Sequence, residues 1–254
     1  PSIGDTTPEP AHPHPRSEQM TFHPEKPPRQ LPLDLAHPVG QSRDDLMVGP
    51  SNSEALALVE SWPHWPSPVV VLAGPPGSGK THLAAIWRDE SGATDLTGRY
   101  SSAQAVEVAT RGPVLIDDVD STRVDETALF HLINAVKQAG TTLLLTARRF
   151  PLAWGVRLPD LESRLKTAAM VEIYEPDDML LTAVLMKLFA DRQVDVDPQV
   201  VQYLARRIER SLSSANTVVS RLDRAALEQK TRISRTLAAQ VIAEMDTGQG
   251  SLDM

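Results

Sequence analysis

Cysteine is absent from the 254 residues, which excludes disulfide bonds, thiolate metal ligands and cysteine nucleophiles. No apolar run approaches the roughly 20 residues that a membrane-spanning helix needs, and no signal-peptide core is visible near the N-terminus. We therefore expect a cytoplasmic protein with no membrane contact. An excess of positive charge is also lacking, since 33 acidic residues outnumber 25 basic ones and the formal net charge is −8. This argues against a protein that coats DNA through bulk electrostatics, but it leaves room for a local basic surface.

Residues 1–43 are poor in the apolar side chains that a folded core needs. Ten of the 21 prolines and four of the seven histidines lie in residues 1–40. Such a segment cannot bury enough apolar surface to offset the entropy of ordering its backbone, so we expect a disordered tail. The histidines have no carboxylates or cysteines nearby in ligand spacing, which favours solvated side chains over a metal site.

A phosphate-binding loop is predicted immediately after a short apolar run at residues 69–72. The run is typical of a buried parallel strand, and the segment GPPGSGKT at 74–81 fits the pattern G-x-x-x-x-G-K-[ST]. In this pattern backbone N–H groups surround phosphate oxygens, the lysine adds positive charge and the threonine hydroxyl coordinates Mg²⁺. A chance glycine-rich turn is the alternative. The candidate ligands of ADP or ATP in this segment are Gly74, Pro75, Gly77, Ser78, Gly79, Lys80, Thr81 and His82.

Two acidic residues follow the next apolar strand, in GPVLIDDVD at 112–120. A carboxylate at the tip of a strand is where a P-loop fold holds Mg²⁺ through water, so we predict Asp117 as a metal ligand together with Thr81. The next acid, Asp118, could orient or deprotonate the attacking water. A solvated turn at the end of the strand is the alternative.

A third buried strand is predicted in TTLLLTARRFP at 141–151, with Thr146 at its tip. A hydroxyl at this position could lie between the two strands described above and contact the γ-phosphate or the attacking water. A threonine that simply ends a strand accounts for the pattern equally well.

From residue 177 onward no strong strand pattern occurs, which predicts a helical domain. Asp177 or Asp178 is well placed to cap the first helix. One face of that helix is apolar, formed by Leu181, Val184, Leu185 and Leu188. Further helices are expected around 197–209, 213–228 and 234–245.

The order and spacing of these motifs resemble the DnaA/Hda family of AAA+ proteins over roughly residues 44–245. The matching segments are VGPSN (48–52), GPPGSGKTHL (74–83), VLIDDVD (114–120), LFHLINAV (129–136), LLTARRFP (144–151) and LPDLESRL (158–165). The resemblance implies an α/β fold with three parts: the disordered tail (1–43), an AAA+ P-loop base domain with a five-stranded parallel sheet (44–175), and a helical lid (176–254). It also implies ADP or ATP with Mg²⁺, and it places Pro50 and Asn52 near the adenine pocket.

A short segment of the tail resembles a partner-binding motif of the same family. Hda-like proteins bind the DNA-loaded sliding clamp, the β subunit of DNA polymerase III, through a segment Q-L-x-L-x-L, and residues 30–35 match it at every fixed position. Pro32 favours an extended backbone that presents its neighbours to a partner pocket. A strand that folds back onto its own domain is the alternative. The candidate partner-binding residues are Gln30, Leu31, Leu33 and Leu35.

The resemblance also implies a mechanism. Hda-like proteins promote hydrolysis of the ATP held by DnaA and so switch initiation off. AAA+ sites form between subunits, which is compatible with a homo-oligomer too, and the family's arginine-finger segment corresponds to Arg164 in DLESRLK. A guanidinium brought to the γ-phosphate in trans stabilises charge in the transition state. Without the resemblance, a surface arginine paired with Asp160 or Glu162 would be the simpler interpretation.

Two positions depart from the family pattern. Ser213 stands where the lid usually presents an arginine to the nucleotide, and Arg210, one turn earlier, is a candidate substitute. Arg148 stands where an acidic residue is common. Both changes put self-catalysed hydrolysis in doubt.

The sequence ends shortly after the lid, whereas DnaA continues into a helix-turn-helix domain, so we expect no direct sequence-specific DNA binding. The expected function is a clamp-tethered negative regulator of replication initiation that stimulates the ATPase of DnaA. A self-contained ATPase of helicase-loader type and a non-catalytic clamp-bound adaptor are the alternatives.

Overall fold

The computed structural model describes residues 42–98, 100–121 and 125–249. The predicted clamp-binding segment 30–35 lies outside these residues, as does nearly all of the predicted tail. In the described part of the chain, no helix is both long and apolar enough to cross a membrane.

Five parallel strands form one sheet in the order β2-β3-β4-β1-β5, which confirms the predicted α/β fold with a five-stranded parallel sheet. The strands predicted at 69–72, within 112–120 and within 141–151 are all present. The bounds are β1 (Val69–Ala73), β2 (Thr94–Asp95), β3 (Val114–Ile116), β4 (Leu143–Ala147) and β5 (Ala169–Glu172).

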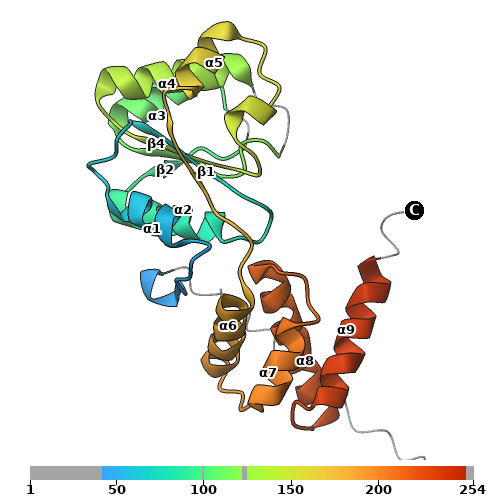
Figure 1. Ribbon diagram of the computed structural model, residues 1–254. Coiled ribbons are helices and arrows are strands. Elements are labelled where there is room, and N and C mark those ends of the chain that lie inside the picture. The colour runs from blue at the N-terminus through green and yellow to red at the C-terminus, as the bar shows by residue number, and fades with distance from the viewer. Residues whose placement is uncertain (1–41, 99, 122–124, 250–254) are drawn as a thin grey trace, which may run out of the picture. The chain divides into compact units, whose positions relative to one another are not determined.

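Helices cover both faces of the sheet, as Figure 1 shows, with α1 and α2 on one side and α3, α4 and α5 on the other. Because successive strand residues point to opposite faces, Val70 and Leu72 pack with α1 and α2, whereas Val69 and Val71 pack with the other three helices. Strands covered on both faces need apolar residues throughout, which explains the unbroken runs in the sequence. The bounds are α1 (Ser53–Glu60), α2 (Lys80–Ser91), α3 (Ser102–Arg111), α4 (Glu126–Ala139) and α5 (Pro159–Leu165).

The strand order brings together residues that are far apart in the sequence. Strand β4 lies between β3 and β1, and its register aligns Thr146 with Leu72 of β1 and Leu145 with Ile116 of β3. All three strands are parallel, so the residues that follow β1 and β3 meet Thr146 at the carboxyl edge of the sheet.

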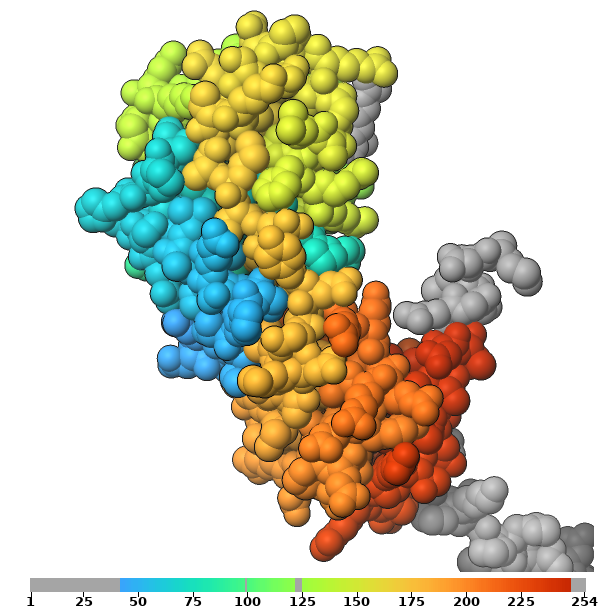
Figure 2. Space-filling view, in the orientation of Figure 1, coloured from blue at the N-terminus to red at the C-terminus, as the bar shows by residue number. Residues whose placement is uncertain are grey.

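Four helices after residue 177 share a hydrophobic core of their own. Their surface is orange to red in Figure 2. They are α6 (Asp178–Asp191), α7 (Pro198–Ala205), α8 (Leu212–Gln229) and α9 (Arg235–Gln249). Asp177 is the residue that caps α6, because its side chain accepts a hydrogen bond from the backbone N–H of Leu180 at 2.7 Å. Helix α7 ends at Ala205, earlier than the predicted end near residue 209, and Ile208 contacts the core of the four helices from the turn that follows.

Candidate nucleotide-binding site

The loop between β1 and α2 has the backbone conformation that its glycines permit. Gly77 and Gly79 have φ values of 71° and 104°, in the left-handed region that favours glycine. A Cβ atom on Gly74 would lie 2.2 Å from the carbonyl oxygen of Ile173, so the loop passes too close to the chain after β5 for any side chain. The predicted phosphate loop is therefore present as a tight turn directly after the central strand.

Lys80 begins α2 and is buried inside this loop. Its Nζ donates hydrogen bonds to the carbonyl oxygens of Gly74 and Pro75, each at 2.8 Å. Burial lowers the pKa of Lys80, and the negative charges of Asp118 and Asp117 act in the opposite direction. The Nζ of Lys80 is thus held inside the loop, in a position to bind an anionic ligand.

Ser78 provides a second observation that fits a phosphate ligand. Its Oγ is buried and has no hydrogen-bond partner among the residues that the structure describes. Buried hydroxyls are normally satisfied, so an unpartnered one beside a lysine and a glycine-rich turn fits a ligand rich in acceptor oxygens. The residues present therefore suit the phosphates of a nucleotide.

Thr146 joins the two acidic residues at the carboxyl edge of the sheet. Its hydroxyl accepts a hydrogen bond from the backbone N–H of Asp118 at 2.7 Å and donates one to Oδ1 of Asp117. The Thr81 hydroxyl donates to Oδ2 of Asp117 at 2.9 Å. The predicted Mg²⁺ ligands Thr81 and Asp117 are thus adjacent, and the hydroxyl of Thr146 is fully buried between β1 and β3.

Within the described ranges, no group of three or more histidine or acidic side chains could hold a metal ion. Mg²⁺ commonly retains water and is bound by one or two protein oxygens together with substrate phosphates. The pair Thr81 and Asp117 fits that kind of metal site, in which the nucleotide supplies further oxygens.

Asp118 has an arginine beside its carboxylate. Its φ of 54° is left-handed, and its Oδ2 lies 3.4 Å from a terminal guanidinium nitrogen of Arg148. Asp120 holds this arginine's backbone, because its carboxylate accepts hydrogen bonds from the N–H groups of Arg148 at 2.8 Å and Arg149 at 3.2 Å. The residue predicted to orient water is therefore engaged in an ion pair within its own chain.

The predicted adenine-side residues form a small closed loop before α1. The Asn52 side chain is buried and bonds to the N–H of Gly49 and the carbonyl oxygen of Met47, both at 2.9 Å, while Pro50 is exposed. The amide of Asn52 thus shapes the loop. His82 lies on α2 with its Nε2 2.9 Å from the carbonyl oxygen of Ser42.

The start of α8 contacts the phosphate loop. The N–H of Leu212 donates to the carbonyl oxygen of Gly77 at 2.8 Å, and the hydroxyls of Ser211 and Ser213 lie 2.6 Å apart. A Cβ on Gly77 would be 2.0 Å from the Ser211 hydroxyl oxygen. Ser213 therefore lies beside the loop, whereas Arg210 pairs with Asp178 of the lid at 2.9 Å.

Three further residues of this site had no sequence signal. Thr97 accepts the N–H of Asp117 at 2.8 Å, but it follows a strand of only two residues. No pattern in the sequence assigns a partner to Asp120, and the close approach of Ser211 to Gly77 depends on tertiary packing. Arg164 lies on α5 and is exposed, apart from this cluster of contacts.

Comparisons with known proteins relate the chain to DnaA. No family model matches. An uncharacterized protein of Haemophilus influenzae is 26% identical over 228 residues, covering 84% of this chain and 98% of that protein. DnaA of Cutibacterium acnes is 24% identical over 229 residues, and DnaA of Herpetosiphon aurantiacus is 26% identical over 225 residues. These alignments cover 80% and 78% of this chain but only 46% and 48% of the DnaA proteins, so the chain spans about half their length.

Solved structures agree at the level of the fold. Domain III of the Thermotoga maritima replication initiation protein DnaA superposes with a TM-score of 0.69 at 18% identity, covering 80% of this chain and 96% of that domain. RuvB, the Holliday junction branch migration motor of Thermotoga maritima, gives 0.64 at 17% identity, over 81% and 72% of the two chains. The chain is thus similar in sequence to about half of DnaA and has the fold of DnaA domain III. AAA+ folds in general bind a nucleotide with Mg²⁺, in agreement with the loop and acidic residues of this DnaA-related chain.

Replacing Thr146 with valine tests the link between the two acidic residues. Thr146→Val keeps the side-chain shape but leaves the N–H of Asp118 without an acceptor, which should lower the free energy of unfolding by about 1–3 kcal/mol. Thr146→Ser keeps the hydroxyl and removes one methyl group, worth about 0.8 kcal/mol. Urea denaturation measures both, and a valine variant as stable as the parent would show that the hydroxyl bridge contributes nothing.

Proposed function

We propose that the protein regulates the DnaA initiator, holding ADP or ATP in its own site and supplying Arg164 to the nucleotide of a neighbouring DnaA subunit. Relationship to DnaA supports a role in replication. The observation that carries the finer proposal is the position of Arg164 relative to the phosphate loop of the same chain.

Arg164 belongs to the amino edge of the sheet. The carbonyl oxygen of Arg164 accepts the hydroxyl of Thr167, and the carbonyl oxygen of Thr167 accepts the hydroxyl of Ser67, which lies just before β1. The phosphate loop follows the other end of β1, and a strand of five residues spans roughly 16 Å. An arginine on this edge is better placed for the nucleotide of another subunit than for its own.

The charge around Arg164 supports the same proposal. Glu162, one of the acids that could have paired with it, binds Lys166 instead at 2.7 Å. Arg164 has no ion pair within the described residues, and its positive charge adds to burial in lowering the pKa of nearby Lys137. Arg164 and Lys137 are neighbouring cations that form no ion pair with a carboxylate among the described residues, so they are suited to bind an anionic group of a partner. The planar guanidinium of Arg164 matches phosphate oxygens.

Two features of the chain's own site support the proposal that it hydrolyses its own nucleotide only weakly. The ion pair between Arg148 and Asp118 occupies a carboxylate oxygen that would otherwise be available to orient water. Ser213 places a neutral hydroxyl, in place of a cation, beside the phosphate loop. We therefore propose that the bound nucleotide serves mainly as a structural ligand.

The first experiment is single-turnover hydrolysis of ATP pre-bound to DnaA, in the presence of the DNA-loaded clamp and this protein. Arginine fingers contribute about 10³–10⁵ to the rate in related systems. We expect acceleration by the parent protein, none by Arg164→Ala, and little by Arg164→Lys because lysine lacks the planar fork.

Arg157→Ala is the matched control, because Arg157 is an exposed arginine of the same base domain and should accelerate as the parent does. Full acceleration by Arg164→Ala, or none by the parent protein, would disprove the proposed mechanism. Sustained ATP turnover by the protein alone would instead favour the helicase-loader alternative.

The second experiment concerns the clamp. We propose that residues 30–35 bind it through leucine side chains, so Leu33→Ala combined with Leu35→Ala should reduce affinity by more than about tenfold, since each buried leucine contributes about 1.5–3 kcal/mol. Asp34→Ala changes a variable position of the same segment and should bind as the parent does. Surface plasmon resonance on immobilised clamp measures all three proteins, and equal binding by the double variant would refute this role of the segment.

A further inference from the structure

The lid contains a basic segment within an acidic protein. Although the formal net charge of the chain is −8, the segment 198–235 carries eight arginines and lysines against three acids. The cations are Arg206, Arg207, Arg210, Arg221, Arg224, Lys230, Arg232 and Arg235, and the acids are Glu209, Asp223 and Glu228. Eight of the chain's 25 lysines and arginines therefore lie on α8, in the turns that follow α7 and α8, and at the start of α9.

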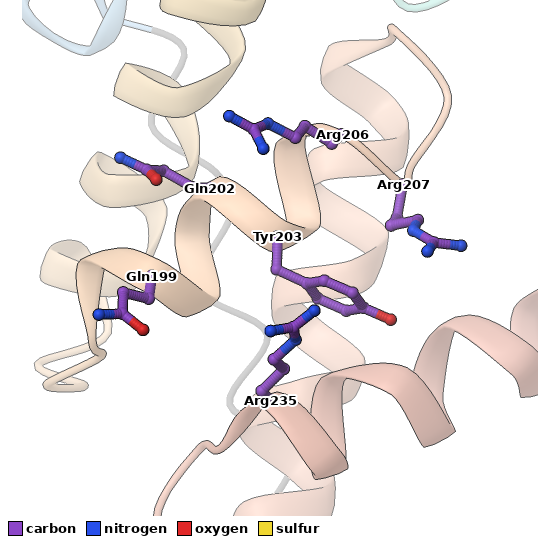
Figure 3. Close-up of a pocket in the computed structure, with 6 residues that line it drawn as sticks. All are labelled: Gln199, Gln202, Tyr203, Arg206, Arg207 and Arg235. Carbon is purple, nitrogen blue, oxygen red and sulfur yellow. The ribbon is translucent and has the colours of Figure 1, made fainter.

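Part of this charge surrounds a cavity of about 470 Å³, which lies outside the nucleotide site (Figure 3). Its walls come from α7, the turn after α7 and the first residue of α9. This volume falls within the range of about 300–1,000 Å³ that is usual for ligand pockets. The lining residues are Gln199, Gln202, Tyr203, Arg206, Arg207 and Arg235.

Tyr203 organises two of the cations. The guanidinium carbons of Arg235 and Arg207 lie 5.0 Å and 5.6 Å from the centre of its ring, and Figure 3 shows the ring between them. The ring is partly buried against the lid core, so it is fixed in place. Cation–π contacts of this kind hold the guanidinium groups at the cavity.

The charge of the cavity is not neutralised by the lid itself. No acidic residue lines it, and no ion pair joins Arg206, Arg207 or Arg235 to a carboxylate within the residues that the structure describes. Nearby Arg210, by contrast, is paired with Asp178. Three exposed guanidiniums around one cavity therefore retain their capacity for an anionic ligand.

We propose that this cavity binds the phosphate backbone of single-stranded nucleic acid. Arginine forks match phosphate oxygens, and the amides of Gln199 and Gln202 add neutral donors. Single-strand-binding surfaces combine positive charge with aromatic rings, as here. A flexible strand can enter a cavity, whereas the regular cylinder of a duplex is contacted mainly through residues that project into its grooves. The lid thus binds nucleic acid in a way that is independent of sequence.

The test is fluorescence anisotropy with a labelled oligothymidylate and the full chain, with Mg²⁺ and ADP in excess so that the phosphate loop cannot capture the probe. We expect Arg206→Ala and Arg235→Ala each to weaken binding by about three- to tenfold. The slope of log K against log salt should fall by about 0.7 for each phosphate group that a variant no longer neutralises.

Arg221→Ala is the control, because Arg221 is an exposed lid arginine that does not line the cavity. Unchanged affinity and salt slope in both cavity variants, or effects no larger than that of Arg221→Ala, would overturn the proposal. An absence of oligonucleotide binding would also overturn the proposal. Binding of polyglutamate in its place would assign the cavity to an acidic peptide, and binding of inorganic triphosphate alone would assign it to a small anion. Because DnaA and the clamp are absent from the assay, its result is independent of the proposed regulatory function.

Discussion

The hydroxyl of Thr146 is the group on which the candidate nucleotide site depends. It is fully buried at the end of the strand that separates β1 from β3, where it receives the N–H of Asp118 and donates to Asp117. Asp117 in turn binds Thr81 at the start of α2. The ends of β3 and β4 and the start of α2 are thereby fixed at one edge of the sheet. The ammonium group of Lys80, the hydroxyl of Thr81 and the carboxylate of Asp117 lie together there.

The sheet also separates two kinds of chemistry. Its carboxyl edge holds the phosphate loop and the acids, whereas its amino edge carries Arg164 and Lys137, with no acid bound to either among the described residues. This arrangement underlies our proposal that the chain keeps one nucleotide and acts on another. The ion pair with Arg148 fits this proposal, because it engages Asp118, the acid that we predicted to orient water.

The local motifs were predictable because each has a strict physical requirement. Apolar runs identify strands that are covered on both faces, and the glycines and Lys80 identify the loop, so the sequence alone located most of the carboxyl edge. The contribution of Thr146 was uncertain, since a threonine at a strand end carries no signal of its own; only the order β3-β4-β1 places it between the acids.

Other features depend on contacts between segments that are distant in the sequence, and such contacts leave no recognisable sequence pattern. Thr97 follows a strand too short to recognise, and the pairing of Arg210 with Asp178 joins the segment before α8 to the start of α6. The cavity around Tyr203 is similar, because Arg235 reaches it from a different helix. The charge of the lid segment is visible in the sequence, but its arrangement around one aromatic ring is not.

Calorimetric titration of ADP, with and without Mg²⁺, tests most directly whether the carboxyl edge is a nucleotide site. The account predicts binding that Mg²⁺ strengthens, that Lys80→Ala abolishes, and that loses its Mg²⁺ dependence in Asp117→Asn. Equal binding by the parent protein and Lys80→Ala, or a Mg²⁺ effect that persists in Asp117→Asn, would contradict it.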